Sequence, residues 1–155
     1  MLFGPVFNLR LKLVARRAVA WWIDGFLVAA ITVVLRWTLQ ATDTTATPEF
    51  DAAFRTIAPA VIFFVYRILI EACTGTSLGK WSMRLRVHTS GVPWASAALR
   101  NSWLLLPMLG LSTYVNDEYL TGALLLLGAI GVATFGVTPW DKLAGASVKL
   151  QPATT

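Results

Sequence analysis

Two carboxylates, Asp24 and Glu71, lie inside strongly apolar stretches of the sequence. An ionised carboxylate alone in lipid costs about 2.5 to 3.5 kcal/mol, so each needs a proton, a polar interior or a basic partner. Both residues are therefore candidates for a proton or cation site. The other interpretation is structural, with each carboxylate tethering elements of the protein together. Glu71 has a basic neighbour, Arg67, one helical turn before it.

The basic partner of Asp24 has several candidates. Arg17 lies seven residues earlier and on the same helix face, but about 10 Å away along the axis at 1.5 Å per residue. A direct bond between the two is therefore not expected. We expect instead a shared polar patch, completed by a basic residue of another segment such as Lys80, Arg84 or Arg100. The number of bases at this depth favours the tether.

The stretch TGTSLGKWSMRLRV, residues 74–87, has glycines and a lysine like a phosphate-binding loop. Such a loop requires G-x-x-x-x-G-K-[ST]. Here only three residues separate Gly75 from Gly79, and Trp81 follows Lys80 where a metal-binding hydroxyl is needed. The stretch also follows a membrane helix rather than a buried strand. No nucleotide is expected to bind.

The same stretch predicts an interfacial amphipathic helix over residues 77–87. Ser77 can cap its start, because its hydroxyl can accept from amides of the first turn. One face is apolar and consists of Leu78, Trp81 and Leu85. Lys80 and Arg84 lie on the opposite side, where they can bind lipid phosphate or a carboxylate such as Asp24 or Asp141.

Other reactive side chains are scarce. The only cysteine is Cys73 and the only histidine is His88, which excludes an internal disulfide and a Cys/His zinc site. No nucleophile–base pair or carboxylate pair stands out at catalytic spacing. The sequence therefore predicts no enzyme activity, no cofactor and no metal.

The composition is typical of an integral membrane protein. Hydrophobic residues make up 56% of the 155 residues and charged residues 14%, against about 25% charged in soluble domains. Four apolar runs approach the ~20 residues needed to cross a bilayer, at about 18–35, 54–73, 94–113 and 119–137. We predict an all-α membrane protein, one domain over 1–155, with four transmembrane helices and the interfacial helix between spans two and three. No internal repeat is evident.

The distribution of charge sets the predicted orientation. Ten of the 13 basic residues fall on one side of the four spans, and five of the eight acidic residues fall on the other. By the positive-inside rule both termini are cytoplasmic. This arrangement explains the net charge of +5 without nucleic acid, and it makes anionic lipid head groups the expected partners. A cleaved signal peptide is disfavoured by Asp24 and by the length of the first run.

Four segments occur in an order that resembles a known family: RRAVAWWIDG, ILIEACTGTSLGKWSMRLRV, SGVPWASAALRNSW and WDKLAGASVKL. They resemble the RDD family of prokaryotic membrane proteins, named for one arginine and two aspartates, from about Val14 to Leu150. The matched positions are Arg17 (or Arg16), Asp24, Gly75, Gly79, Lys80, Arg100 and Asp141. The resemblance implies a location in the cytoplasmic membrane. Transport of ions or other ligands, including cation/proton exchange, has been proposed for members.

Two functions remain open. The first is an accessory or structural subunit that packs against a larger membrane complex or another copy of itself. The second is a small cation/proton transporter that uses Asp24 and Glu71. The surroundings of Asp24 distinguish them, because a basic side chain within hydrogen-bond reach supports a tether and a water-filled path supports transport.

Overall fold

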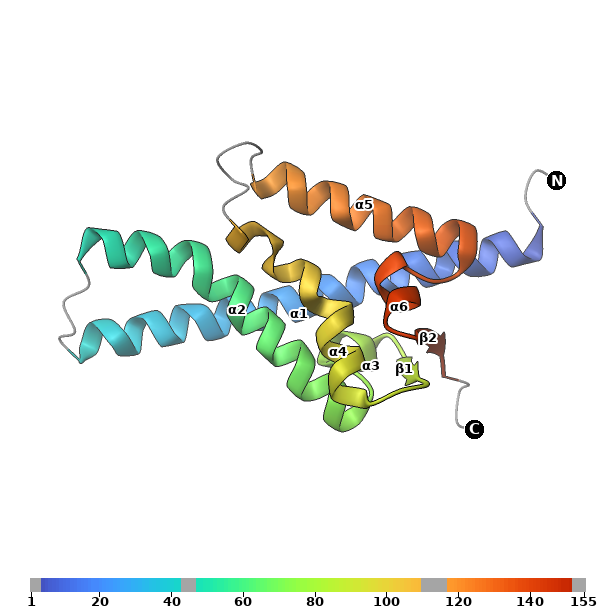
Figure 1. Ribbon diagram of the computed structural model, residues 1–155, viewed down its shortest axis with the longest axis horizontal. Coiled ribbons are helices and arrows are strands. Elements are labelled where there is room, and N and C mark those ends of the chain that lie inside the picture. Colours follow the sequence, from blue (N-terminus) through green and yellow to red (C-terminus); the bar gives the residue numbers. More distant parts are fainter. Residues whose placement is uncertain (1–3, 43–46, 110–116, 152–155) are drawn as a thin grey trace.

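A computed structural model describes residues 4–42, 47–109 and 117–151, which are mostly helical. The elements in chain order are α1 (Pro5–Ala41), α2 (Pro48–Thr74), α3 (Leu78–Ser82), β1 (Leu85–Thr89), α4 (Pro93–Asn101), the 3₁₀ helix η1 (Ser102–Leu109), α5 (Asp117–Phe135), α6 (Pro139–Leu143) and β2 (Ala146–Leu150). In Figure 1, α1 runs the length of the molecule, and the short elements α3, β1, α6 and β2 gather beside its N-terminal half.

The helices α1 and α2 are long and apolar enough to cross a membrane, and the apolar segment of α5 is shorter. The predicted first two spans, 18–35 and 54–73, lie within α1 and α2. At 1.5 Å per residue the 37 residues of α1 extend about 55 Å, well beyond the ~30 Å of a hydrocarbon core. One end of α1 therefore extends past the apolar region.

The predicted third span, 94–113, is not one continuous helix. α4 ends at Asn101, η1 follows as far as Leu109, and residues 110–113 lie outside the described residues. The predicted fourth span, 119–137, coincides with α5 as far as Phe135. Gly136 then adopts a positive φ of 81°, which ends the helix. The count of four spans stays a prediction.

The fold is mostly helical, as predicted, but the expectation that it contains helices alone is wrong, because β1 and β2 form a small antiparallel sheet. Leu85 pairs with Leu150, and Thr89 pairs with Ala146. Leu85, Val87, Ala146 and Val148 are buried on one face and pack against Ala20 of α1. The sheet therefore attaches the short elements to the first long helix.

The expected interfacial helix over residues 77–87 is also wrong beyond Ser82. Ser77 caps α3 as predicted, with its hydroxyl accepting from the Lys80 amide. The chain then turns at Arg84, whose φ is 56°, and β1 begins at Leu85. The apolar–polar alternation of Leu85, Arg86 and Val87 fits a half-buried strand, and burial of this pattern against α1 overrides the helical spacing.

The structure contains an internal repeat that the sequence does not display. In each unit a long helix ends at a glycine with positive φ, a hydroxyl residue caps a five-residue helix, a second positive-φ residue follows, and a strand begins. Equivalent residues lie 61 positions apart (136 − 75 = 61). They include Gly75 and Gly136, Ser77 and Thr138, Arg84 and Gly145.

Backbone hydrogen bonds repeat with the same offset. The Gly75 amide donates to Glu71 O at 3.0 Å and the Gly136 amide to Val132 O at 2.9 Å. The pairing of β1 with β2 is centred on the equivalent residues Val87 and Val148. The two units are thus related by an approximate two-fold axis through the sheet. Few side chains are identical between them, which explains why the sequence shows no repeat.

Candidate functional site

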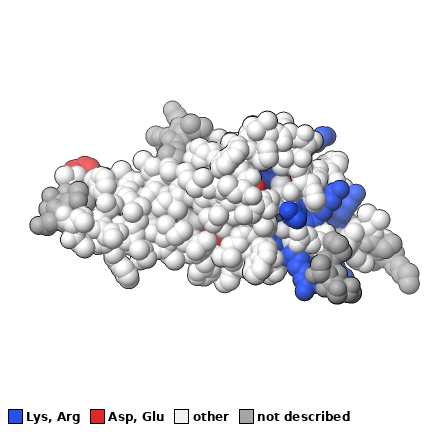
Figure 2. Space-filling view, turned by 90° about the horizontal axis from the view of Figure 1, so that it is seen from below, with Lys and Arg blue, Asp and Glu red and all other residues white. Residues whose placement is uncertain are grey.

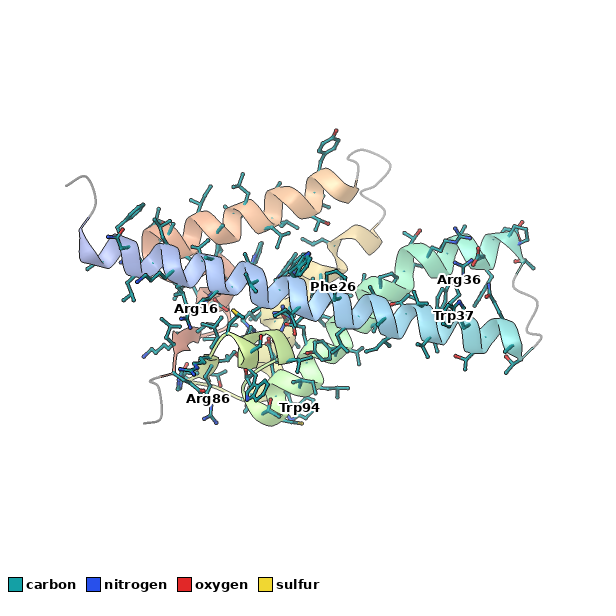
Figure 3. The ribbon with its side chains drawn as sticks, turned by 180° about the vertical axis from the view of Figure 1, so that it is seen from behind. Arg16, Phe26, Arg36, Trp37, Arg86 and Trp94 are labelled. Carbon is teal, nitrogen blue, oxygen red and sulfur yellow. The ribbon has the colours of Figure 1, made fainter. Side chains whose placement is uncertain are left out.

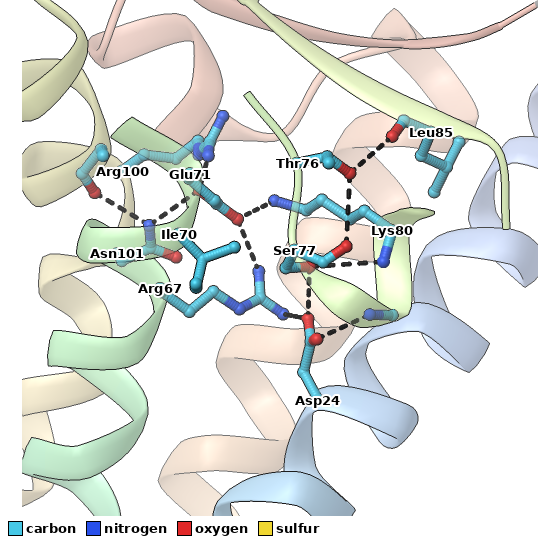
Figure 4. A network of polar contacts seen from close by, with 12 residues as sticks. Asp24, Arg67, Ile70, Glu71, Thr76, Ser77, Lys80, Leu85, Arg100 and Asn101 are labelled. Atoms are coloured by element: carbon cyan, nitrogen blue, oxygen red, sulfur yellow. Dashed lines mark hydrogen bonds and ion pairs between the residues drawn. The ribbon is translucent and has the colours of Figure 1, made fainter. Parts of the chain in front are cut away.

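Asp24 is completely buried, and its side-chain partners among the described residues belong to α2 and to the start of α3. Its Oδ1 accepts from the Tyr66 hydroxyl at 2.9 Å and the Gly79 amide at 2.8 Å. Its Oδ2 accepts from Ser77 Oγ at 2.6 Å and pairs with Arg67 Nη2 at 3.0 Å (Figure 4). One carboxylate of α1 thus holds both α2 and the start of α3.

Gly79 explains how the start of α3 reaches Asp24. A Cβ at this position would lie 1.9 Å from the carbonyl oxygen of Ala20 in α1. Only glycine therefore allows the backbone of α3 to approach α1 closely enough for its amide to reach the carboxylate. The Gly79 amide can donate to Asp24 only because the backbone of α3 lies this close to α1.

Glu71 lies near the end of α2 and is surrounded by donors. Its Oε1 contacts the Lys80 ammonium and lies 3.4 Å from Arg67 Nη1. Its Oε2 contacts the Arg100 guanidinium and accepts from Asn101 Nδ2 at 3.2 Å. The side chain of Glu71 is 1% exposed. Three cations from α2, α3 and α4 therefore converge on this one carboxylate.

Asp141 extends the network to α6 and the N-terminal part of α1. Its Oδ2 pairs with Arg17 Nη1 at 2.8 Å, and its Oδ1 lies 3.6 Å from Arg100 Nε. It also forms a capping box with Thr138, which fixes the start of α6. Burial raises the pKa of Asp141, but Arg17 and Arg100 outweigh this, and the pKa lies below its usual value.

The ionic network consists of Arg17, Asp24, Arg67, Glu71, Lys80, Arg100 and Asp141. It joins α1, α2, α3, α4 and α6 and contains four bases and three acids. Burial lowers the pKa of Lys80 well below that of a lysine in water, and the Arg67 guanidinium lowers it further. The charges nearly cancel, which is what allows so many of them to be buried together.

The structure selects among the predicted partners. The base that contacts Asp24 is Arg67, which the sequence assigned only to Glu71, and not Lys80, Arg84 or Arg100. Lys80 turns inward to Glu71, while Arg84 is exposed in the turn and lies outside the network.

Leu78 and Trp81, expected to form the apolar face of an amphipathic helix, are exposed. Sequence reasoning missed Tyr66, Ser77 and Asn101 as ligands of the carboxylates. Tyr66 directly precedes Arg67 in the sequence but has no helical i, i+3 or i, i+4 spacing to Arg67 or Glu71, so no spacing signal marked it.

A scan against protein families matches the RDD family model over residues 12–145. The chain belongs to the RDD family. Neither the curated proteins nor the solved structures contain a match. The match and the two long apolar helices together identify a membrane protein.

The positions expected from the RDD resemblance converge in this structure. Of the two adjacent arginines, Arg17 pairs with Asp141, while Arg16 is exposed and donates to Met83 O at 3.0 Å. Asp24, Lys80 and Arg100 all lie in the ionic network. Gly75 ends α2 with a φ of 70°, and Gly79 permits the approach to α1. The RDD-type segments are therefore far apart in sequence and adjacent in space.

Proposed function

We propose that this RDD-family protein is a four-span protein of a prokaryotic cytoplasmic membrane that acts as an accessory or structural subunit of a larger membrane assembly. The observation that carries the proposal is the enclosure of Asp24. The carboxylate is fully buried, and its basic partner, Arg67, lies at 3.0 Å. This is the arrangement expected of a tether.

The distribution of charge supports the orientation. In Figure 2, Lys and Arg gather toward one end of the molecule, and acidic atoms are visible at the other. Figure 3 places Arg16 and Arg86 near the first end and Arg36 and Trp37 near the second. The 19 residues from Arg17 to Arg36 rise about 28 Å, close to the thickness of a hydrocarbon core. Both termini then lie in the cytoplasm.

The surface outside the ionic network supports a packing role. Trp22, Phe26, Val34, Trp37 and Val61 are exposed on α1 and α2. In a membrane these faces contact lipid or the helices of another protein. The carboxylates of the ionic network are enclosed by basic partners, so these exposed apolar faces are the surfaces we propose for packing against a partner. The proposed partners are membrane subunits or a second copy, without nucleic acid or nucleotide.

Cation/proton transport is the second candidate, and the internal repeat favours it. Transporters often consist of repeats with the substrate site at their interface, and the ionic network here lies beside the β1–β2 axis. Against it stands the electrostatics, because Glu71 is held by three cations and Asp24 by one. A cation entering this site would have to displace Arg or Lys from both acids.

Reconstitution in liposomes distinguishes the two functions. Proton-coupled cation flux is measured for the wild type, Asp24→Asn and Asp51→Asn, the last a control because Asp51 lies outside the ionic network. We expect no flux from any of them, together with co-purification of the wild type with a larger complex. Specific flux in the wild type and Asp51→Asn, absent in a folded Asp24→Asn protein, would establish the transporter and overturn the accessory subunit.

A further inference from the structure

A cavity of about 450 Å³ lies between α1, the α4–η1 segment and α5. Its wall is mostly apolar and includes Trp103, Leu124, Leu125, Ala129 and Val132. This volume is within the range of small-molecule sites in proteins. Residues of the apolar helices α1 and α5 line it.

One side of the cavity is strongly basic. The ionisable residues that line it are Arg17, Arg67, Lys80, Arg100 and Asp141, which are four bases and one acid. Glu71 and Asp24 pair with Arg67, Lys80 and Arg100 and so neutralise part of this charge, but they do not line the cavity. The cavity therefore presents an excess of positive charge to whatever enters it.

Several buried donors on this side have no hydrogen-bond partner within the described part of the chain. They are Nε and Nη2 of Arg17, Nη1 of Arg100, Nε of Arg67 and Nε1 of Trp21. All four residues line the cavity, and the side chains of Arg67 and Arg100 are 9% and 5% exposed. A buried charged donor without an acceptor is costly. The arrangement calls for an acceptor from outside the chain.

We propose that this cavity binds an anionic amphiphile. Its acidic head group accepts from Arg17, Arg100 and Trp21, and its hydrocarbon chain lies against Leu125, Ala129 and Trp103. A free inorganic anion would leave the apolar wall uncovered, and a neutral lipid tail would leave the basic donors without an acceptor. Neither therefore fits the cavity. This binding goes beyond the accessory role and does not depend on a partner protein.

Binding to the purified full-length protein in neutral detergent tests the proposal. Palmitate is compared with hexadecanol, which has the same chain without the charge, using native mass spectrometry and titration calorimetry. We expect one palmitate per protein and at least about tenfold weaker binding of hexadecanol, since hydrogen bonds to a charged group exceed those to a neutral one.

A matched pair of variants locates the site without disturbing the ionic network. Ala129→Phe places a ring in the cavity, whereas Ala123→Phe makes the same change at an exposed position of α5. We expect palmitate binding to be lost only in Ala129→Phe, with both variants as thermally stable as each other. Equal binding of palmitate and hexadecanol, or undiminished binding to Ala129→Phe, would overturn the proposal.

Competition identifies the physiological source of the anion. If phosphatidylglycerol displaces palmitate and phosphatidylcholine does not, the head group comes from an anionic bilayer lipid. If neither phospholipid displaces palmitate, the cavity takes a free single-chain acid. Either result supports an anionic amphiphile, and displacement by both lipids equally would contradict it.

Discussion

The two repeated units, residues 75–89 and 136–150, share a backbone but are held in place differently. In the first, α3 is fixed from outside by Asp24 and packs directly on α1 through Gly79. In the second, Asp141 of α6 both completes a capping box within its own helix and pairs with Arg17 of α1. The equivalent third residues of α3 and α6 are Lys80 and Asp141, which carry opposite charges.

This difference shows how a symmetric backbone acquires an asymmetric interior. Each unit places its third short-helix residue toward the centre, and two equal charges there would repel each other. Because one is a lysine and the other an aspartate, the surrounding Glu71 and Arg100 can link them in one chain of ion pairs. The pairing of β1 with β2 brings the two units together, and the opposite charges of Lys80 and Asp141 distinguish one unit from the other.

The largest expected difference between the two units comes from Asp24→Ala, which removes the carboxylate that holds the first unit. Arg67 keeps only Glu71 at 3.4 Å and loses its closer partner, and α3 loses the carboxylate that holds it. Breaking a buried ion pair costs about 3–5 kcal/mol. We expect hydrogen exchange at the Gly79 amide to accelerate, while the Lys142 amide in the second unit, bonded to Thr138 O, stays protected. Unfolding in detergent measures the loss of stability.

The matched control is Asp51→Ala at the other end of α2. Asp51 pairs with Arg36 and Arg55 where the side chains are partly exposed, so the change should cost less than about 1 kcal/mol. Equal losses for the two variants would show that burial does not set the strength of these pairs.

Asp141→Asn tests the second unit through pH. The amide weakens the pairs with Arg17 and Arg100, and we expect a loss of about 1.5–3 kcal/mol near neutral pH. Because the folded pKa of Asp141 lies below the ordinary aspartate value of 3.8, its contribution is complete above that pH. It is lost as pH falls through the folded pKa.

The difference in unfolding free energy between the wild type and Asp141→Asn should therefore shrink below about pH 3.8. Denaturant unfolding across that range measures it. A difference that stays constant down to the lowest pH at which the protein folds would contradict the ion pair as the source of the stability.

The parts of the fold that depend on composition could be predicted from the sequence. Apolar runs long enough for a bilayer locate α1 and α2, because a single segment carries that signal. The partner of Asp24 could not be found this way. Arg67 has an acid one turn away on its own helix, and only the packing of α1 against α2 shows that it reaches Asp24 as well.

The β1–β2 sheet was missed for a similar reason. Its strands are five residues each and far apart in sequence, so neither carries a strong pattern alone. The alternation around Leu85 becomes informative only when Val148 is known to lie opposite Val87. Likewise the role of Gly79 depends on Ala20, which a local motif does not contain.

Gly79→Ala tests whether the short helix of the first unit depends on its close approach to α1. The added methyl group meets the backbone of Ala20, and overpacking of this kind costs about 1–3 kcal/mol. The equivalent residue of the second unit is Trp140, so no such close approach exists there. Gly91→Ala is the control, since no atom lies within 4 Å of its added Cβ. Thermal unfolding should separate the two variants, and similar midpoints would contradict the close approach.

The smallest expected effect comes from making the first unit more like the second. Arg84 has a φ of 56°, and the equivalent Gly145 has a φ of 58°. A non-glycine residue pays about 1–2 kcal/mol for this conformation, and glycine costs about 0.5–1 kcal/mol in chain entropy, so Arg84→Gly should stabilise the protein by less than about 1 kcal/mol. Gly145→Ala should destabilise it by more, because its Cβ would also lie 2.9 Å from Ser90 Oγ. Opposite shifts in the unfolding midpoint would show that the two turns are conformationally equivalent, and a loss of stability in both variants would show that the Arg84 side chain contributes contacts that outweigh its strained backbone.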